Sequence, residues 1–192
     1  MRKRLKSPLT CVLLALLFLL GTSLQAAEIK GVGFEDQILV EGTSLKIQGV
    51  ALMKWAGFIN VYAGALYLPE AHSSTAWDDD ITKSLELSYF HGIKAADFGS
   101  SSDKLLKNAL TEAEYDSLSE RLKTFYGLFR DVSPGDRYRL SYSPGKGTEL
   151  HWNDELLGTA PGADFAQAYF GIWLGDKPIN KSFRDRLLAE DA

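Results

Sequence analysis

The sequence predicts a single α+β domain built around an antiparallel β-sheet. Residues 29–68 and 137–157 carry the two-residue periodicity of strands, and residues 94–129 carry the longer period of helices. A further helical block follows residue 162. Strands and helices that come in separate blocks, rather than alternating one by one, are typical of α+β folds with an antiparallel sheet. At 192 residues the chain has the length of one domain.

The first strand block begins with apolar residues that alternate with polar ones on both sides of a turn. Ile38 and Val40 precede Glu41-Gly42, and alternation resumes beyond this dipeptide. Residues 58–68 form a long apolar and aromatic run, which predicts a central strand that Pro69 ends. Leu85, Leu87 and Tyr89 then alternate with polar neighbours and predict one more strand.

The helical block is expected to form a hairpin of two helices over residues 94–129. Its second half has apolar residues at spacings of three and four, as a half-buried helix requires. Thr111 and Glu114 have the spacing of a capping box, in which hydroxyl and carboxylate each bind a free backbone N–H. This pair predicts that the second helix begins just after Thr111.

The last third of the chain predicts strands and then two more helices. Alternation at 137–142, a turn at 143–147 and apolar residues at 150 and 152 indicate a hairpin. Residues 165–173 have helical spacing, and Gly175 is placed to end that helix. A final helix is expected from about Lys181 to Ala189.

The first 27 residues have the three-part pattern of a secretory signal peptide. Basic residues at 2–6 precede an apolar run at 11–20, and small residues lead to Ala26 and Ala27. We expect cleavage near Ala26/Ala27, which leaves residues 28–192 as a periplasmic or secreted domain. The alternative is a membrane anchor, but a spanning helix needs ~20 apolar residues. No stable membrane span is therefore expected after cleavage.

Composition and motifs narrow the classes of function. The chain has a formal charge of −4, and four cations precede its first acid, so residues 28–192 carry −8. This balance argues against nucleic acid or an anionic membrane surface as a partner. Cys11, in the leader, is the only cysteine, and no phosphate-binding or dinucleotide-binding glycine motif is present. The sequence predicts no cofactor and no metal site.

Three stretches together resemble the chalcone isomerase-like family of exported bacterial proteins. They are Val61–Pro69, then Gly135–Tyr138 with Pro144–Thr148, and finally Gly158–Gly162 with Phe165 and Ile172–Pro178. The resemblance covers the chain from about Gly31 to Leu188. It implies an open-faced antiparallel sheet with a layer of helices on one face and a ligand cleft between them. The family includes enzymes that close a flavanone ring and non-catalytic members that bind fatty acids.

The resemblance also suggests where the cleft lies in this sequence. Lys54 matches the arginine that holds the enzyme's substrate, and Tyr62 matches a threonine that polarises its ketone. Phe98 and Ile172 match positions that carry hydroxyls in the enzyme, so two of four polar groups are absent. Each lost donor of this kind costs ~3 kcal/mol of barrier stabilisation, which makes flavonoid isomerisation a poor expectation.

The leading hypothesis is a non-catalytic protein that binds a small hydrophobic or amphiphilic ligand, such as a fatty acid or an aromatic acid. Lys54 would pair with a carboxylate beside Tyr62, and Trp55, Phe58 and Phe98 would supply apolar wall. Two alternatives remain, an isomerase (intramolecular lyase) that uses Tyr62 as general acid and a structural module of the cell envelope. In a purely structural interpretation, Tyr62 and Phe58 are core residues and Lys54 is a surface residue.

Overall fold

The computed structural model describes residues 27–189, so the predicted leader lies outside the described residues except for its last position. A seven-stranded sheet dominates the fold, and every strand in it pairs antiparallel with the next strand of the chain. A separate two-stranded hairpin precedes it. The strands are β1 (Ala27–Ile29), β2 (Val32–Phe34), β3 (Gln37–Val40), β4 (Thr43–Trp55), β5 (Ile59–Leu68), β6 (Lys83–Tyr89), β7 (Arg137–Ser143), β8 (Gly147–Trp152) and β9 (Glu155–Ala160).

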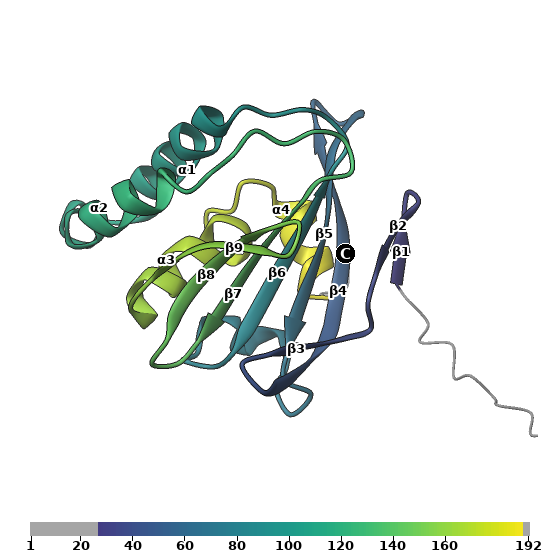
Figure 1. Ribbon diagram of the computed structural model, residues 1–192, viewed down its shortest axis with the longest axis horizontal. Helices are drawn as coiled ribbons and strands as arrows, with labels where there is room; N and C mark the ends of the chain where they lie inside the picture. The colour runs from purple at the N-terminus through teal and green to yellow at the C-terminus, as the bar shows by residue number, and fades with distance from the viewer. Residues whose placement is uncertain (1–26, 190–192) are drawn as a thin grey trace, which may run out of the picture.

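The helices gather on one face and one end of this sheet (Figure 1). Helices α3 and α4 lie against the face, whereas α1 and α2 form a hairpin beside α3 that two long segments connect to β6 and β7. The α+β class and the open-faced sheet with a helical layer are thus confirmed. The helices are α1 (Ala95–Ala109), α2 (Glu112–Tyr126), α3 (Ala163–Leu174) and α4 (Lys181–Leu187), with a short 3-10 helix at Ser74–Asp78.

The periodicity of each strand decides which side chains meet the helices. In β6, Leu85, Leu87 and Tyr89 belong to the main core beneath the helices, whereas Ser84 and Glu86 lie on the opposite face. The run at 58–68 is an internal strand as predicted, because β5 pairs with β4 on one side and β6 on the other. One sheet therefore carries an apolar face under helices and a more polar face away from them.

Close approaches at two glycines bring α4 directly onto the sheet. A Cβ atom at Gly49 would lie 2.3 Å from the carbonyl oxygen of Arg186, and one at Gly64 would lie 2.6 Å from the ring of Phe183. Both distances are too short for a real side chain, so these positions in β4 and β5 require glycine. Asn180 caps the start of α4, because its side chain accepts from the backbone N–H of Phe183 at 2.9 Å.

The predicted helical hairpin is confirmed, and so is its capping box. The hydroxyl of Thr111 accepts from the backbone N–H of Glu114 at 3.3 Å, and the carboxylate of Glu114 accepts from that of Thr111 at 2.8 Å. The two helices pack closely where a Cβ atom at Gly99 would lie 3.1 Å from that of Tyr126. The hairpin therefore behaves as one unit that packs against α3.

The small β1–β2 hairpin covers part of the face away from the helices. Phe34 is 2% exposed and forms a second core with β5 side chains from that face, among them Ala65 and Tyr67. Arg137 of β7 lies over the ring of Phe34 at 5.1 Å and donates to the carbonyl oxygen of Gly33 at 2.9 Å. The first described residues are thus fixed to the sheet by both burial and charge.

Candidate functional site

A hollow lies between the sheet and the helical layer, and its lining comes from five elements and one connecting segment. Its volume is about 50 Å³, well below the ~300–1,000 Å³ of typical ligand pockets. No charged side chain lines it. The lining residues are Leu85, Leu87 and Tyr89 of β6, Phe98 and Ser102 of α1, Phe129, Tyr138 and Leu140 of β7, Leu150 of β8, and Tyr169 and Trp173 of α3.

Aromatic rings form most of this wall. Tyr89 packs edge-to-face with Phe98, with ring centroids 5.6 Å apart, and with Tyr138 at 6.0 Å. Phe98 stacks on Phe129 at 5.1 Å. Both phenylalanines are only half-buried, so this stacked pair separates the hollow from solvent. A ligand larger than the hollow would enter by displacing these two rings.

Most polar groups around the hollow have partners within the protein. The hydroxyl of Tyr138 donates to the carbonyl oxygen of Arg130 at 2.9 Å and accepts from its backbone N–H at 2.8 Å. The hydroxyls of Ser102 and Tyr169 lie 3.1 Å apart, within hydrogen-bond distance. These bonds hold three of the lining residues in fixed positions.

Tyr89 is the exception among the lining hydroxyls. Its side chain is 4% exposed, yet its hydroxyl makes no hydrogen bond with any described residue. Burial raises its pKa well above the usual value for tyrosine, and the neighbouring phenols of Tyr62, Tyr138 and Tyr169 reinforce that rise. The group therefore stays neutral and offers one unused O–H donor within an apolar hollow.

The structure separates the residues that the resemblance had grouped. Tyr62 is 7% exposed; it contacts Tyr89, and its hydroxyl accepts from the indole N–H of Trp173 at 3.1 Å. Phe98 lines the hollow. Tyr62 itself is not among the lining residues; it lies behind Tyr89 and Trp173. Ile172 is 3% exposed, and its neighbour Trp173 faces the hollow instead.

The expectation that Lys54, Trp55 and Phe58 line the same cleft is wrong. All three are exposed at the turn between β4 and β5, with Trp55 65% and Phe58 76% exposed. The reason is local: the strand ends at Trp55, and Ala56-Gly57 adopt positive φ angles of 50° and 80° that reverse the chain. Lys54 and Tyr62 therefore do not converge on one ligand.

Four functional candidates were missed by sequence reasoning, namely Tyr89, Tyr138, Tyr169 and Trp173. Their strand alternation and helical spacing marked them as core residues, which they are. What distinguishes Tyr89 is the lack of a hydrogen-bond partner. No signal in a single sequence reports that, because it depends on the contacts made by residues far apart in the chain.

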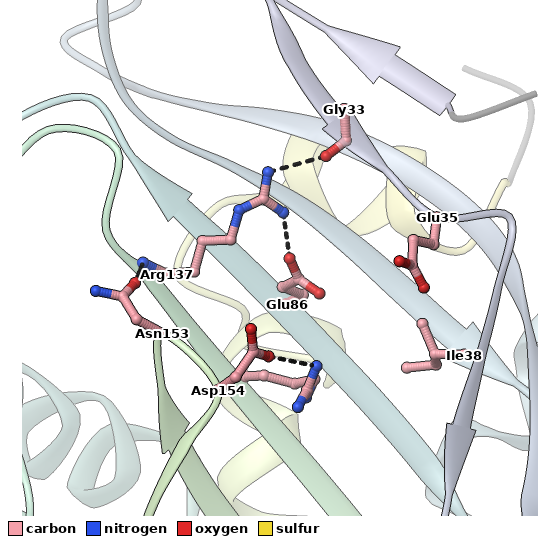
Figure 2. Close-up of a pocket in the computed structure, with 8 residues that line it drawn as sticks. Gly33, Glu35, Ile38, Glu86, Arg137, Asn153 and Asp154 are labelled. Atoms are coloured by element: carbon pink, nitrogen blue, oxygen red, sulfur yellow. Dashed lines mark hydrogen bonds and ion pairs between the residues drawn. The ribbon is translucent and has the colours of Figure 1, made fainter.

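A second, larger pocket of about 310 Å³ lies on the opposite face, under the β1–β2 hairpin (Figure 2). Arg137 forms an ion pair with Glu86, and Arg139 pairs with Asp154 at 3.1 Å. As Figure 2 shows, Arg137 also reaches the carbonyl of Gly33. Both arginines of this pocket thus pair with acidic residues of the protein itself. The contact of Arg137 with Gly33 also holds the β1–β2 hairpin in place.

A buried lysine lies elsewhere under the helices. Lys83 is 1% exposed, and its ammonium donates to the carbonyl oxygens of Trp77 at 2.6 Å and Asp79 at 2.7 Å. The rings of Tyr142 and Phe170 lie 5.2 and 5.8 Å from it. Burial lowers the pKa of Lys83 to about 8, although nearby aspartates oppose that change. These contacts give Lys83 a role in connecting the 3-10 helix to the sheet.

Two further classes of site were sought in the described part of the chain. Among residues 27–189, no three histidine, aspartate or glutamate side chains are grouped so that they would hold a metal ion. The helices within the same range are each too short or too polar to cross a membrane. Neither a metal site nor a spanning helix is thus added to the candidates in this part of the chain.

An antiparallel sheet with helices on one face and a hollow between the layers defines the open-faced class of fold. A family model described as chalcone isomerase-like matches residues 26–189. The chain therefore belongs to the chalcone isomerase-like family. A solved structure of a fatty-acid binding protein from Arabidopsis thaliana is similar, with a TM-score of 0.68 and 16% identity over 85% of this chain and 96% of that one. At this identity the likeness shows a shared fold. A search of the curated proteins finds no match.

Proposed function

We propose that this protein is a non-catalytic carrier that holds a small amphiphilic molecule in the hollow between the sheet and the helices. The observation that carries the proposal is the unpartnered hydroxyl of Tyr89 within an otherwise apolar hollow. Apolar walls with one or two placed polar groups are what ligand pockets offer an amphiphile. The name of the similar Arabidopsis protein, which binds fatty acids, supports the same class of ligand.

The chemistry of the lining specifies the head group of that ligand. Tyr89 would donate to a ligand oxygen, but no lining residue is a cation. An ionised carboxylate would thus be buried without a partner, at a cost of several kcal/mol. We infer that the bound head is uncharged, which favours a protonated fatty acid, an ester, an alcohol or a ketone. This replaces the carboxylate-to-Lys54 pairing that the resemblance suggested.

Binding requires the hollow to grow, because about 50 Å³ cannot hold a long chain. Phe98 near the start of α1 and Phe129 after α2 would move together, since they stack on one another. Both flank the α1–α2 hairpin, which lies at one end of the sheet (Figure 1). Outward movement of that hairpin would enlarge the hollow without disturbing a strand.

The alternative of an intramolecular lyase receives less support. Its candidate acid, Tyr62, lies behind the wall of the hollow and already accepts a hydrogen bond from Trp173. Burial also raises the pKa of Tyr62 far above neutrality, which makes the phenol a poor proton donor. A group of this kind is better suited to packing than to proton transfer.

Native mass spectrometry of purified protein tests the proposal directly, followed by binding of palmitic acid, its methyl ester and hexadecane. We expect the first two to bind and to change the emission of Trp173, which lines the hollow. Trp173→Phe should remove the optical signal while mass spectrometry still reports the complex. Absence of any bound species, together with no thermal shift across the three compounds, would contradict the proposal.

The inference that the bound head group is uncharged is tested by the pH dependence of ligand affinity. A protein that binds only the neutral acid should lose affinity about tenfold for each pH unit above the acid's free pKa of roughly 4–5. The methyl ester has no such group and serves as the control, with unchanged affinity from pH 5 to 8. Equal pH dependence for both compounds would show that the protein itself titrates and that the head-group argument is wrong.

We also propose that the protein is exported, as its first 27 residues predict. The supporting pattern is the basic start, the apolar run and the small residues at Ala26 and Ala27. Expression of the full chain in a bacterium, followed by fractionation, tests this. The intact mass of periplasmic or secreted material should correspond to a chain that begins near Glu28. Full-length protein retained in the cytoplasm would refute it.

A further inference from the structure

The tip of the β4–β5 hairpin exposes two large aromatic side chains, one on each side of its two-residue turn Ala56-Gly57. Trp55 and Phe58 are 65% and 76% exposed, and the backbone N–H of Phe58 donates to the carbonyl of Trp55 at 3.3 Å across the turn. Figure 1 shows this hairpin projecting beyond the end of the sheet. Exposed apolar side chains that gather at one place usually mark a contact with another molecule.

The size of the tip favours a lipid bilayer over a protein partner. A stable protein interface covers ~800 Å² on each side and needs a complementary shape. Two aromatic side chains provide ~150–250 Å² each and stand on a protruding turn. A bilayer demands no complementary shape, and tryptophan is enriched where proteins meet the interface between water and hydrocarbon.

The charges decide which kind of bilayer fits. Residues 28–192 carry a formal charge of −8, which opposes approach to an anionic surface. Lys54, also exposed, is the cation next to the tip, and its long side chain would reach back to the headgroups while the rings insert. A bilayer of zwitterionic lipids is therefore the matching surface.

The tip lies at the same end of the sheet as the hollow. Strand β5 leads from Ile59 to Tyr62, which pairs with Tyr89 of the hollow wall. The four steps along the chain from Phe58 to Tyr62 span about 13 Å. Insertion of the tip would thus bring the hollow close to the lipid headgroups.

We propose that Trp55 and Phe58 dock the protein on zwitterionic membranes, from which it takes up its ligand. The docking step stands on the tip itself, whereas the uptake step rests on the proposed carrier function. The tip presents two exposed apolar side chains together, whereas Leu39 of β3, which is 73% exposed, is a single exposed side chain on a different strand.

Cosedimentation with phosphatidylcholine vesicles tests the docking step. We compare the wild type with the double variant Trp55→Ser/Phe58→Ser and with Leu39→Ser as the matched control. The double variant should have a partition coefficient at least tenfold lower, and Leu39→Ser should bind as the wild type does. Vesicles with brominated lipids should quench the tryptophan emission of the wild type. The emission of Trp55→Phe should be the same with these vesicles as without them.

Several outcomes would overturn the proposal. The first is equal binding of the double variant and the wild type, and the second is equal loss in Leu39→Ser. A third is self-association of the wild type without vesicles that the double variant abolishes, since the tip would then join two copies. To separate this proposal from the carrier function, ligand is also supplied in solution. The double variant should still bind it, whereas Tyr89→Phe should bind vesicles normally and hold the ligand less tightly.

Discussion

Removal of the Tyr89 hydroxyl should weaken ligand binding and leave the stability of the protein nearly unchanged. The hydroxyl makes no hydrogen bond with any described residue, but it is not one of the fully enclosed side-chain atoms that lack a partner. Tyr89→Phe keeps the ring and its packing against Phe98 and Tyr138. We therefore expect the free energy of unfolding to change by less than about 1 kcal/mol, because no hydrogen bond within the protein is lost. A bound ligand would lose one hydrogen bond of about 0.5–1.5 kcal/mol, or roughly two- to twelvefold in affinity.

Tyr138→Phe is the matched control, because this tyrosine lines the same hollow but has both hydrogen bonds to Arg130. Loss of the Tyr138 hydroxyl leaves the backbone N–H and the carbonyl of Arg130 without their partner, so the free energy of unfolding should fall by about 1–2 kcal/mol. Urea unfolding and ligand titration measure the two effects. If Tyr89→Phe destabilises as much as Tyr138→Phe, the Tyr89 hydroxyl has a partner in the folded protein and the reasoning fails.

Three further predictions concern the scaffold. Lys83 has a pKa of about 8 in the folded protein against 10.5 in the unfolded chain, so between pH 8 and 9.5 the unfolded chain holds more protons. The free energy of unfolding of the wild type should therefore rise with pH relative to that of Lys83→Met. Parallel plots of unfolding free energy against pH for the two proteins would contradict this. Arg137→Ala should lower the free energy of unfolding by about 2 kcal/mol, because Glu86, which is nearly buried, loses its ion-pair partner. Arg139→Ala should lower it by under about 1 kcal/mol in the same urea assay, because its partner Asp154 is 85% exposed. Thr111→Ala should cost about 1 kcal/mol by loss of the helix cap and Thr111→Ser much less; equal losses would argue against the cap.

The fold was predictable from the sequence because each element is coded locally. Alternation in β6, the capping box at Thr111 and the turn at Glu41-Gly42 each depend on residues within a few positions of one another. The order of the strands is equally local, because each strand of the large sheet pairs with its neighbour in the chain. The family resemblance then implied that the helices form a layer on one face of the sheet.

The site was predictable only in part, since it depends on contacts between distant elements. Phe98 lines the hollow, whereas Lys54, Trp55 and Phe58 lie at the β4–β5 turn. Lys54 was assigned to the cleft by its match to the family's arginine, and the two aromatic residues were expected to supply apolar wall beside it. The sequence Ala56-Gly57 contained the missing signal, as a two-residue turn with glycine second is typical of a tight hairpin. Recognising that turn would have placed the flanking aromatics at an exposed tip.

The two faces of the sheet differ in how much movement they allow. The face away from the helices is held by the Arg137–Glu86 ion pair and by Phe34, so the first described hairpin is fixed there. On the opposite face, α4 is pressed onto β4 and β5 through Gly49 and Gly64, which leaves little room for movement. Besides Trp173 of α3, the half-buried rings at the hollow's edge are Phe98 and Phe129 on the α1–α2 side. A protein that must open for a ligand yet remain folded would place its mobility there, because displacement of that hairpin breaks no strand pairing.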